Sequence, residues 1–475
     1  MNKKLNPGVL IISQTESLYM KKFFLQTLLA AFVIFPAGVF AQGNKTVNAA
    51  SDERDYVFLF GNAHRDTAVV RVLYENAPKY FNAPDMPRFA IIGKDRKFYL
   101  GIGGYVKGTL SYDLGNPIES PIYFETSSIP MDNRPGNGAM VQFSAATSNL
   151  FFNFVALPHS KNKIGAYVNF NFTGGPNSYG FNLRSAYITY RNFIVGYNTS
   201  LFTDGAASAP TIDQQGPNGM TFVFNTVIDY QYTINKHWSF GLGLEMPAVN
   251  ATYNEYNYAL NQRVPDIPAY VQYRWADGNG WARLSGLWRN MYYRNDVDNE
   301  TVDRMGWAVK LSGALPFGKK LTVFYQGVYG KGIGSYIQDM QGYGLDMVPV
   351  AGRSGVGIPV SYDGRLENVE AWGMYAGLQY QITHKLLASA TYSMVNSYLP
   401  SSEADAFVPG PANGLDNAYM PGSTYKSAKY VVANMFYSIT PSVTAGIEYL
   451  WGCRENADGA FKQDTRLQTA IRVNF

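Results

Sequence analysis

The sequence predicts an all-β protein, a transmembrane antiparallel β-barrel of sixteen strands, and three observations predict it. From Lys97 onward, segments of about 10–18 residues alternate between apolar and polar side chains, as half-buried strands do. After residue 41, no run approaches the ~18 unbroken apolar residues that a membrane-spanning helix needs. The connections are short and long in turn, which is typical of barrels with short periplasmic turns and long external loops.

The composition agrees with this class. Only 16% of the 475 residues are charged, whereas soluble domains average roughly 25%, and the chain holds 36 Tyr and 29 Phe. The net charge of +4 is spread along the chain, so nucleic acid is not indicated as a partner. Cys453 is the only cysteine and the four histidines are scattered, so the sequence predicts no disulfide within the chain, no metal site and no cofactor.

The first segment reads as a secretory signal. From Met20 the chain continues MKKFFLQTLLAAFVIFPAGVFAQ, with two lysines, an apolar run that ends at Pro36, and a small-x-small cleavage pattern at 39–41. We expect residues 1–41 to be the signal peptide region, with Met20 as the true start. A single membrane anchor is the alternative. Residues 42–97 read as polar and then extended, and we expect them to form a periplasmic N-terminal extension ahead of a barrel at 98–475.

The strands are recognised by two-residue periodicity. In 166–173, Ala, Val, Phe and Phe alternate with Tyr, Asn, Asn and Thr. In the last segment, Leu467, Thr469, Ile471, Val473 and Phe475 oppose polar residues such as Arg466 and Gln468. The predicted strands lie near 98–113, 139–157, 164–174, 180–190, 193–202, 221–233, 238–247, 268–276, 280–294, 304–316, 320–337, 366–383, 385–398, 425–439, 442–455 and 461–475.

Backbone chemistry makes closure of the sheet the consistent solution. In hydrocarbon every N–H and C=O needs a partner within the protein, which only a helix or a closed sheet provides. The outward face then meets lipid, the inward face meets water, and the last strand pairs with the first. We therefore predict integral insertion in the outer membrane, with outer-membrane lipid as a partner. The terminal Phe475 resembles the signal read by the outer-membrane assembly machinery.

A secreted β-propeller or β-helix is the alternative fold. Propellers repeat every 40–50 residues with shared motifs, and this sequence shows no such period. A soluble barrel would not need apolar residues facing outward on so many strands.

Charged residues on the predicted inward face are mostly basic. A barrel of this strand number leaves an aqueous channel, and rings of Arg or Lys in a pore favour anions. The alternative is that lumen arginines pair with lumen carboxylates and stiffen the wall. The acidic residues on this face are Glu245 and Glu448, with Asp113 near a rim, and the basic residues are Lys107, Arg184, Arg274, Arg283, Arg289, Lys310, Arg466 and Arg472.

The connection 203–220, TDGAASAPTIDQQGPNGM, would be the third external loop. In porins this loop folds inward and narrows the channel. Asp204 and Asp213 are then candidates to face the arginines and set a transverse field. An ordinary surface loop is the alternative.

Enzyme classes are poorly supported. His159, His237 and His384 fall in or beside short turns, away from the channel, and the G-x-S-x-G, H-E-x-x-H and P-loop motifs are lacking. An outer-membrane hydrolase would need a His poised beside a Ser on the wall, and no predicted strand interior holds a His. We therefore predict that the protein is not an enzyme.

Several motifs in order resemble the DcaP-like family of trimeric outer-membrane porins, over roughly residue 98 to the end. They are Leu183-Arg184 with Ala186-Tyr187, Ser200 to Gly219, Glu245-x-Pro247, and Gly446 to Phe475 with Glu448-Tyr449, Arg454 and Arg466-Leu467-Gln468. The resemblance implies a sixteen-stranded homotrimer that passes small anionic solutes such as dicarboxylates. It also implies roles for Arg184, Glu448, Arg454 and Arg466. The chain departs from the family in lacking N-terminal heptads and in having Asn182 and Ser185 where the family tends to be basic.

The leading hypothesis from the sequence is thus a passive diffusion porin with an Arg/Lys-lined, anion-preferring channel. A structural or adhesion barrel with a plugged pore is the alternative.

Overall fold

The structure is a computed structural model that describes residues 56–60, 67–81, 83–84, 86–93, 95–133, 136, 138–175, 179–355, 358–400 and 422–475. The chain divides into two compact units, Met1–Glu53 and Arg54–Phe475, and every described residue belongs to the second. The predicted signal peptide region and His64 lie outside the described residues. Within those residues, no helix is long and apolar enough to cross a membrane.

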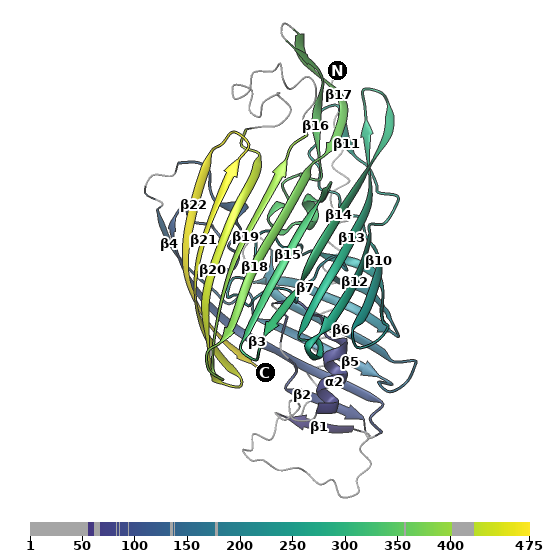
Figure 1. Ribbon diagram of the computed structural model, residues 1–475, viewed down its shortest axis with the longest axis vertical. Coiled ribbons are helices and arrows are strands. Elements are labelled where there is room, and N and C mark those ends of the chain that lie inside the picture. The colour runs from purple at the N-terminus through teal and green to yellow at the C-terminus, as the bar shows by residue number, and fades with distance from the viewer. Residues whose placement is uncertain are drawn as a thin grey trace, which may run out of the picture. The chain divides into compact units, whose positions relative to one another are not determined.

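The second unit is a closed antiparallel barrel with sixteen strand positions, which confirms the predicted fold class (Figure 1). β22 pairs with β3 from Asp464↔Gly115 to Asn474↔Tyr105 and so closes the sheet. Two positions are split, because β4 and β5 both pair with β3, and β11 and β12 both pair with β13. The strands are β3 (Phe98–Gly115), β4 (Ala139–Ser144) with β5 (Asn149–Ala156), β6 (Ile164–Gly174), β7 (Gly180–Tyr190), β8 (Phe193–Thr199), β9 (Phe224–Thr233), β10 (Trp238–Glu245), β11 (Asn257–Ala259) with β12 (Ile267–Trp275), β13 (Gly280–Asn295), β14 (Glu300–Phe317), β15 (Leu321–Lys331), β18 (Glu370–Gln381), β19 (Leu386–Tyr398), β20 (Tyr425–Thr440), β21 (Val443–Asn456) and β22 (Phe461–Asn474).

The predicted strand ranges differ from the structure mainly at the external ends. The predicted strand 320–337 ends at Lys331, since Gly332 has a φ of 69° and the chain turns there into the 3-10 helices η4 (Gly334–Tyr336) and η5 (Gln338–Met340). The long connection that follows contains a hairpin of β16 (Met347–Gly355) and β17 (Ile358–Asn368), which the periodicity did not indicate.

The two rims differ as predicted. The turns after β5, β7, β9, β12, β14, β18 and β20 are short, the turn after β12 being the 3-10 helix η3 (Ala276–Gly278), and the carboxyl end of the chain lies on that rim (Figure 1). Phe475 continues the closing ladder, because its N–H donates to the Gly104 carbonyl and its carbonyl accepts from the Gly104 N–H. Phe475 and Gly104 therefore form the last backbone pair of the β22–β3 ladder.

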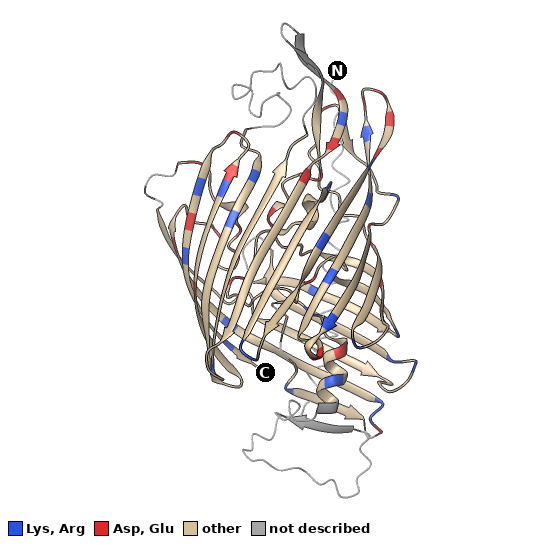
Figure 2. Ribbon diagram, viewed as in Figure 1, with Lys and Arg blue, Asp and Glu red and all other residues tan. Residues whose placement is uncertain are grey.

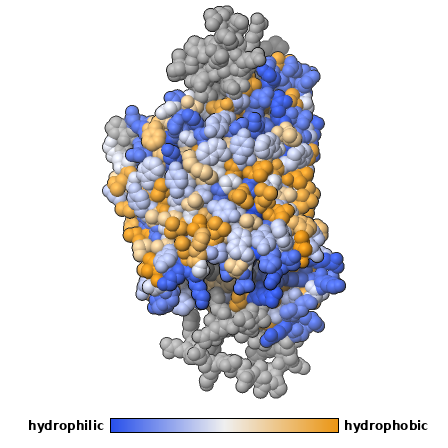
Figure 3. Space-filling view, viewed as in Figure 1, coloured by the Kyte–Doolittle hydropathy of each residue, from blue (hydrophilic) through white to orange (hydrophobic). Residues whose placement is uncertain are grey.

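The strands present an apolar outer face and a polar inner face. On β22, Leu467, Ile471 and Val473 are 46%, 51% and 42% exposed, whereas Arg466 and Gln468 are 0% and 2% exposed. The visible face of the barrel is orange mainly over its middle and blue towards both ends (Figure 3), and charged positions gather near the rims (Figure 2). An apolar band flanked by polar rims is what a barrel needs to sit in a bilayer.

A small element precedes the barrel. β2 (Phe89–Gly93) pairs with the first residues of β3, from Phe89↔Ile102 to Ile92↔Tyr99, and β1 (Tyr56–Phe60) pairs with β2. Helix α2 (Thr67–Asn76) buries Val69, Val72 and Leu73 against β2, β3 and β5. The sequence itself predicts an extended segment here. The helix forms because its apolar residues recur at helical spacing and meet an apolar patch of the sheet.

An outward-facing residue near the middle of β22 tests the membrane-facing assignment. Replacing Leu467 with Arg should lower the free energy of unfolding from lipid vesicles by about 2–4 kcal/mol, because a charge then faces hydrocarbon. Urea titration followed by tryptophan fluorescence measures it. Leu467→Met, which keeps the site apolar, should unfold like the parent, and an equal midpoint for the arginine variant would contradict the assignment.

Candidate functional site: the barrel lumen

Three external connections fold into the barrel. They are the β3–β4 connection around η2 (Thr126–Ser128), the β8–β9 connection at 200–223, and the β15–β18 connection around η4 and η5. Residues 200–222 are buried almost without exception. The third external loop therefore lies inside the lumen rather than on the surface.

Glu448 on β21 fixes the tip of this loop. Its carboxylate accepts hydrogen bonds from the backbone N–H groups of Ile212 and Asp213 at 2.7 and 2.8 Å. The amides of Asn434 and Gln468 donate to the same carboxylate. Four neutral donors thus use its acceptor positions, which makes Glu448 an anchor for the loop. Charge-assisted hydrogen bonds of this kind are about twice as strong as neutral ones.

The two predicted loop carboxylates are bound in the same manner. Asp204 accepts from Trp281 Nε1 at 3.1 Å and from Ser312 Oγ at 2.7 Å. Asp213 accepts from the Phe124 N–H at 2.9 Å and from the Tyr430 hydroxyl at 3.0 Å. Both side chains are buried and tie the loop to the wall and to the first connection. A role for them in a transverse field stays a prediction.

The three inward connections also bind one another. Asp339 of η5 accepts from Thr126 Oγ1 at 2.7 Å, from the Ser127 N–H at 3.2 Å and from the Tyr425 hydroxyl at 2.6 Å. Asn218 of the third loop donates to Thr126 Oγ1 at 2.9 Å. These contacts join the three connections to one another inside the lumen.

Two of the predicted basic residues form buried ion pairs. Arg289 lies 3.0 Å from Asp266 and 3.2 Å from Asp346, and it also donates to backbone carbonyls of the external connections. Arg466 makes a two-pronged contact with Asp113. At these two positions, lumen arginines pair with lumen carboxylates and stiffen the wall, as the alternative interpretation of the sequence predicts.

Other predicted basic residues contact the third loop through neutral groups. Arg283 donates to the Leu201 carbonyl, Lys310 to the Phe202 carbonyl and to Thr221 Oγ1, and Lys107 to the Ile212 carbonyl at 2.7 Å. Their partners are oxygens of peptide groups and a hydroxyl.

The remaining predicted positions lie elsewhere on the wall. Arg184 sits at a bulge of β7, 4.2 Å from the Phe224 ring centre, and Arg274 is half-buried near the short-turn end of β12. Arg472 lies 4.0 Å from the Tyr105 ring centre. Glu245 accepts from Ser200 Oγ and from the Leu201 N–H at 2.9 and 2.7 Å.

Sequence reasoning did not find Asp266, Asp346 and Tyr336 as members of this network. Asp266 and Asp346 bind Arg289, and the Tyr336 hydroxyl donates to Asp266 at 2.9 Å. All three were assigned to long connections or strand ends, where two-residue periodicity no longer indicates which side chains meet.

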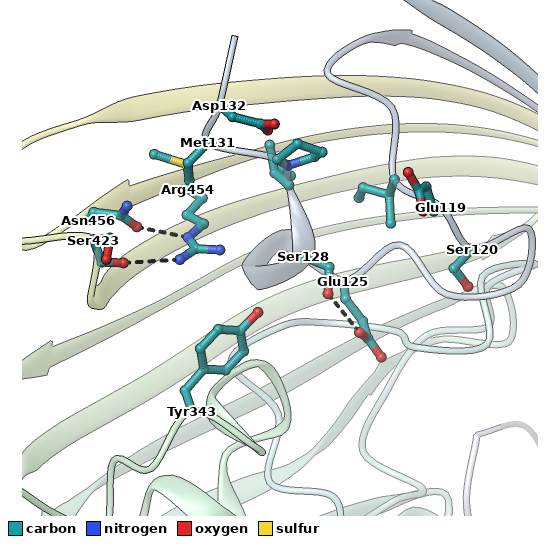
Figure 4. Close-up of a pocket in the computed structure, with 13 residues that line it drawn as sticks. Glu119, Ser120, Glu125, Ser128, Met131, Asp132, Tyr343, Ser423, Arg454 and Asn456 are labelled. Carbon is teal, nitrogen blue, oxygen red and sulfur yellow. Dashed lines mark hydrogen bonds between the residues drawn. The ribbon is translucent and has the colours of Figure 1, made fainter. Parts of the chain in front are cut away.

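One cavity lies between the three inward connections and each rim. The external one, about 570 Å³, is lined by Glu119, Glu125 and Asp132 of the first connection together with Tyr343 and Arg454 (Figure 4). Arg454 is held by Asn456 Oδ1 and by the carbonyls of Ser127 and Ser423.

The second cavity, about 450 Å³, opens near the short-turn rim and is lined by Lys107, His384, Lys385 and Arg472, with no Asp or Glu among the described residues that line it. Along β21, Thr444 and Gly446 line this cavity, Glu448 anchors the loop, and Arg454 and Asn456 line the external one. The short-turn cavity, the loop anchor Glu448 and the external cavity thus follow one another along β21 from one rim to the other.

A closed sixteen-stranded barrel with an apolar outer belt and inward-folded loops defines an outer-membrane porin, an integral channel protein rather than an enzyme. A family model described as "Porin subfamily" matches residues 151–472, and the chain belongs to this family. No curated protein matches the chain.

Solved structures share the fold. The outer membrane channel DcaP of Acinetobacter baumannii aligns with a TM-score of 0.65 and 20% identity over 81% of this chain and 99% of that one. A loop L8 deletion mutant of OmpT from Vibrio cholerae aligns with a TM-score of 0.49 and 11% identity, over 80% and 100% of the two chains. An anion-selective porin from Comamonas acidovorans gives 0.48 and 11%, with the same coverage. The first of these confirms the resemblance in fold that the sequence indicated.

The buried Asp113–Arg466 pair gives a prediction about stability. Arg466→Gln should cost about 3–5 kcal/mol of unfolding free energy, because it leaves the Asp113 carboxylate buried without its partner. The double variant Asp113→Asn, Arg466→Gln should recover part of that loss. Denaturant unfolding of all four proteins of this cycle measures the coupling, and strictly additive losses would show that the pair does not act as a unit.

Proposed function

We propose that this porin passes small, preferentially anionic solutes, dicarboxylates among them, by passive diffusion. The observation that carries the proposal is an imbalance of charge pairing within the lumen. Among the inward-facing carboxylates, Asp113 is engaged by an arginine and Glu448 by neutral donors. Both carboxylate oxygens of Asp464 and one of Asp229 are buried without a hydrogen bond. Of the eight basic residues that the sequence places on the inward face, five form no salt bridge with a described Asp or Glu: Lys107, Arg184, Arg274, Arg283 and Lys310.

This imbalance favours anions for an electrostatic reason. A positive wall raises the local concentration of anions and lowers that of cations, and the low-dielectric barrel focuses the field into the channel. Guanidinium groups also match carboxylate geometry with two parallel hydrogen bonds.

The preference is measurable in a planar bilayer. Under a tenfold KCl gradient the reversal potential should have the sign of chloride permeation, and Arg184→Gln, Arg274→Gln should shift it towards zero because two unpaired lumen charges are removed. The matched control is Lys319→Gln, Lys320→Gln, which removes two charges from the exposed turn between β14 and β15. A cation-favouring potential in the parent protein refutes the proposal.

A structural or adhesion barrel with a plugged pore is the second candidate, because three connections meet inside the lumen. It predicts almost no single-channel current. Stepwise conductance that scales with KCl concentration rules it out.

We also propose that the protein is a homotrimer, that residues 1–41 are a removed signal and that the assembly machinery reads the C-terminal strand, as the sequence indicates. Sedimentation equilibrium in density-matched detergent should give three times the mass of the mature chain. A single-chain mass would contradict the trimer.

A further inference from the structure

Part of the chain ahead of the barrel lies inside it. We call the described residues of 67–87, which comprise α2 and part of the stretch that leads to β2, the lumen segment. Asn76 Nδ2 donates to Asn153 Oδ1 at 2.8 Å, and Asn153 Nδ2 donates to the Leu73 carbonyl at 2.8 Å. The Tyr187 hydroxyl donates to the Asn76 carbonyl at 2.7 Å. Asn153 of β5 and Tyr187 of β7 are wall residues that are 0% and 5% exposed, so the end of α2 lies on the inner face of the barrel.

The lumen segment also reaches the third loop. The Tyr80 hydroxyl accepts from Asn169 Nδ2 of β6 at 2.9 Å. The Tyr80 ring lies 5.9 Å from the Phe222 ring, edge to face, and the same apolar cluster holds Met220 and Tyr375. Met220 and Phe222 belong to the third loop, whereas Tyr375 belongs to β18, which lies nearly opposite β6 in the strand order of the ring. The lumen segment thus connects the β6 wall to a cluster that reaches β18.

Glycines on the wall and on the third loop leave room for the lumen segment. A Cβ added at Gly101 of β3 would lie 2.6 Å from Pro87 Cγ. A Cβ added at Gly205 of the third loop would lie 2.6 Å from Tyr80 Cβ and 2.9 Å from its Cα, which no change of rotamer can move away. Glycine permits this close approach of backbone. The barrel and its loop are therefore shaped to the segment at two separate places.

Burial and neutral hydrogen bonds hold the segment more than its charges do. Glu75 forms ion pairs with Arg71 at 3.1 Å and with Lys163 of the β5–β6 turn at 2.8 Å, and these groups are partly exposed. Exposed pairs of this kind contribute little. Val72 and Leu73 are buried, and the Asn76–Asn153 hydrogen bond is buried as well. Breaking such contacts is costly because the polar groups would lose their partners.

The far end of the segment borders open space in the lumen. Phe81 lines the cavity of about 450 Å³ near the short-turn rim, together with Pro210 and Ile212 of the third loop. Its ring also lies 6.0 Å from the Phe222 ring, edge to face. The segment and the third loop therefore share the wall of the space that leads to this rim.

We propose that the lumen segment is a second constriction element, which together with the third loop sets the size limit for solutes on the short-turn side. The inference rests on the proposed diffusion function and adds to it the element that selects by size. Selection by size does not depend on the charge of the solute, so uncharged solutes can test it separately from the anion preference.

Replacing residues 67–87 of the full chain with a Gly/Ser linker of equal length tests the element as a whole. Single-channel conductance in KCl should rise at least about twofold, because the removed side chains free cross-section of the lumen. In liposome swelling, the rate for raffinose relative to glucose should rise about fivefold or more, because the larger sugar gains most from a wider passage. Heat-modifiable migration in detergent gels shows whether the barrel has folded.

Phe81→Cys tests the same element without a deletion, and it decides the matter if the linker variant does not fold. Its conductance should exceed that of the parent, and benzyl methanethiosulfonate, which attaches a phenyl ring to the new thiol, should return it towards the parent value. The parent treated with the same reagent should not change, because Cys453 is only 4% exposed.

Phe89→Ala is the matched control. It removes an aromatic ring from β2 on the outward side, where Phe89 pairs with Ile102 and is 39% exposed. Conductance and the ratio of sugar rates should equal those of the parent.

Unchanged conductance and an unchanged sugar ratio in the folded variants overturn the inference. A wider passage in the variants supports it whatever the sign of the reversal potential, and a cation-favouring potential overturns only the anion preference. A parent that conducts almost nothing, beside a linker variant that conducts, supports the constriction and overturns passive diffusion through the parent channel.

Discussion

Satisfaction of backbone hydrogen bonds in a medium without water is the constraint on which this structure depends. A strand edge left open in hydrocarbon costs several kcal/mol for each unpaired group. The β3–β22 ladder removes that edge, and with it the barrel acquires an inside and an outside. The period-two sequence pattern, the exposed Leu467 and the buried Arg466 all follow from this closure.

The second organising fact is how the lumen is filled. Sixteen strands enclose more space than wall side chains can occupy, and here backbone from three connections takes up the excess. Buried backbone must itself be paired, which explains why so many wall residues are short donors and acceptors. Ser312, Gln326 and Asn434, for example, bind loop atoms rather than one another. The chemistry of the channel lining thus depends on the wall residues that anchor the loops as much as on the basic residues without a salt bridge.

Sequence reasoning predicted what two-residue periodicity encodes. The faces of β22, the sixteen strands and the short-turn positions of His159, His237 and His384 could be read because side chains alternate strictly along a strand. Helix α2 could have been found from the helical spacing of Val69, Val72, Leu73 and Asn76. The partners of Arg289 could not have been found from the sequence, because Asp266 and Asp346 lie in segments without periodicity. Only the three-dimensional path of the chain brings them to Arg289.

The small strand ahead of the barrel constrains the seam. β2 pairs with β3 as far as Ile102, and Phe475 of the last strand pairs with Gly104. A single β3 position, Gly103, therefore separates β2 from Phe475 along the edge of β3. A shift of the β22 pairing register by one residue would turn its apolar face towards the lumen. A slip by two, which preserves the faces, would drive Phe475 into the place of Phe89. The amino-terminal segment therefore blocks a shift of the carboxyl-terminal strand in this direction by steric exclusion, in addition to the side-chain preferences that set the alignment.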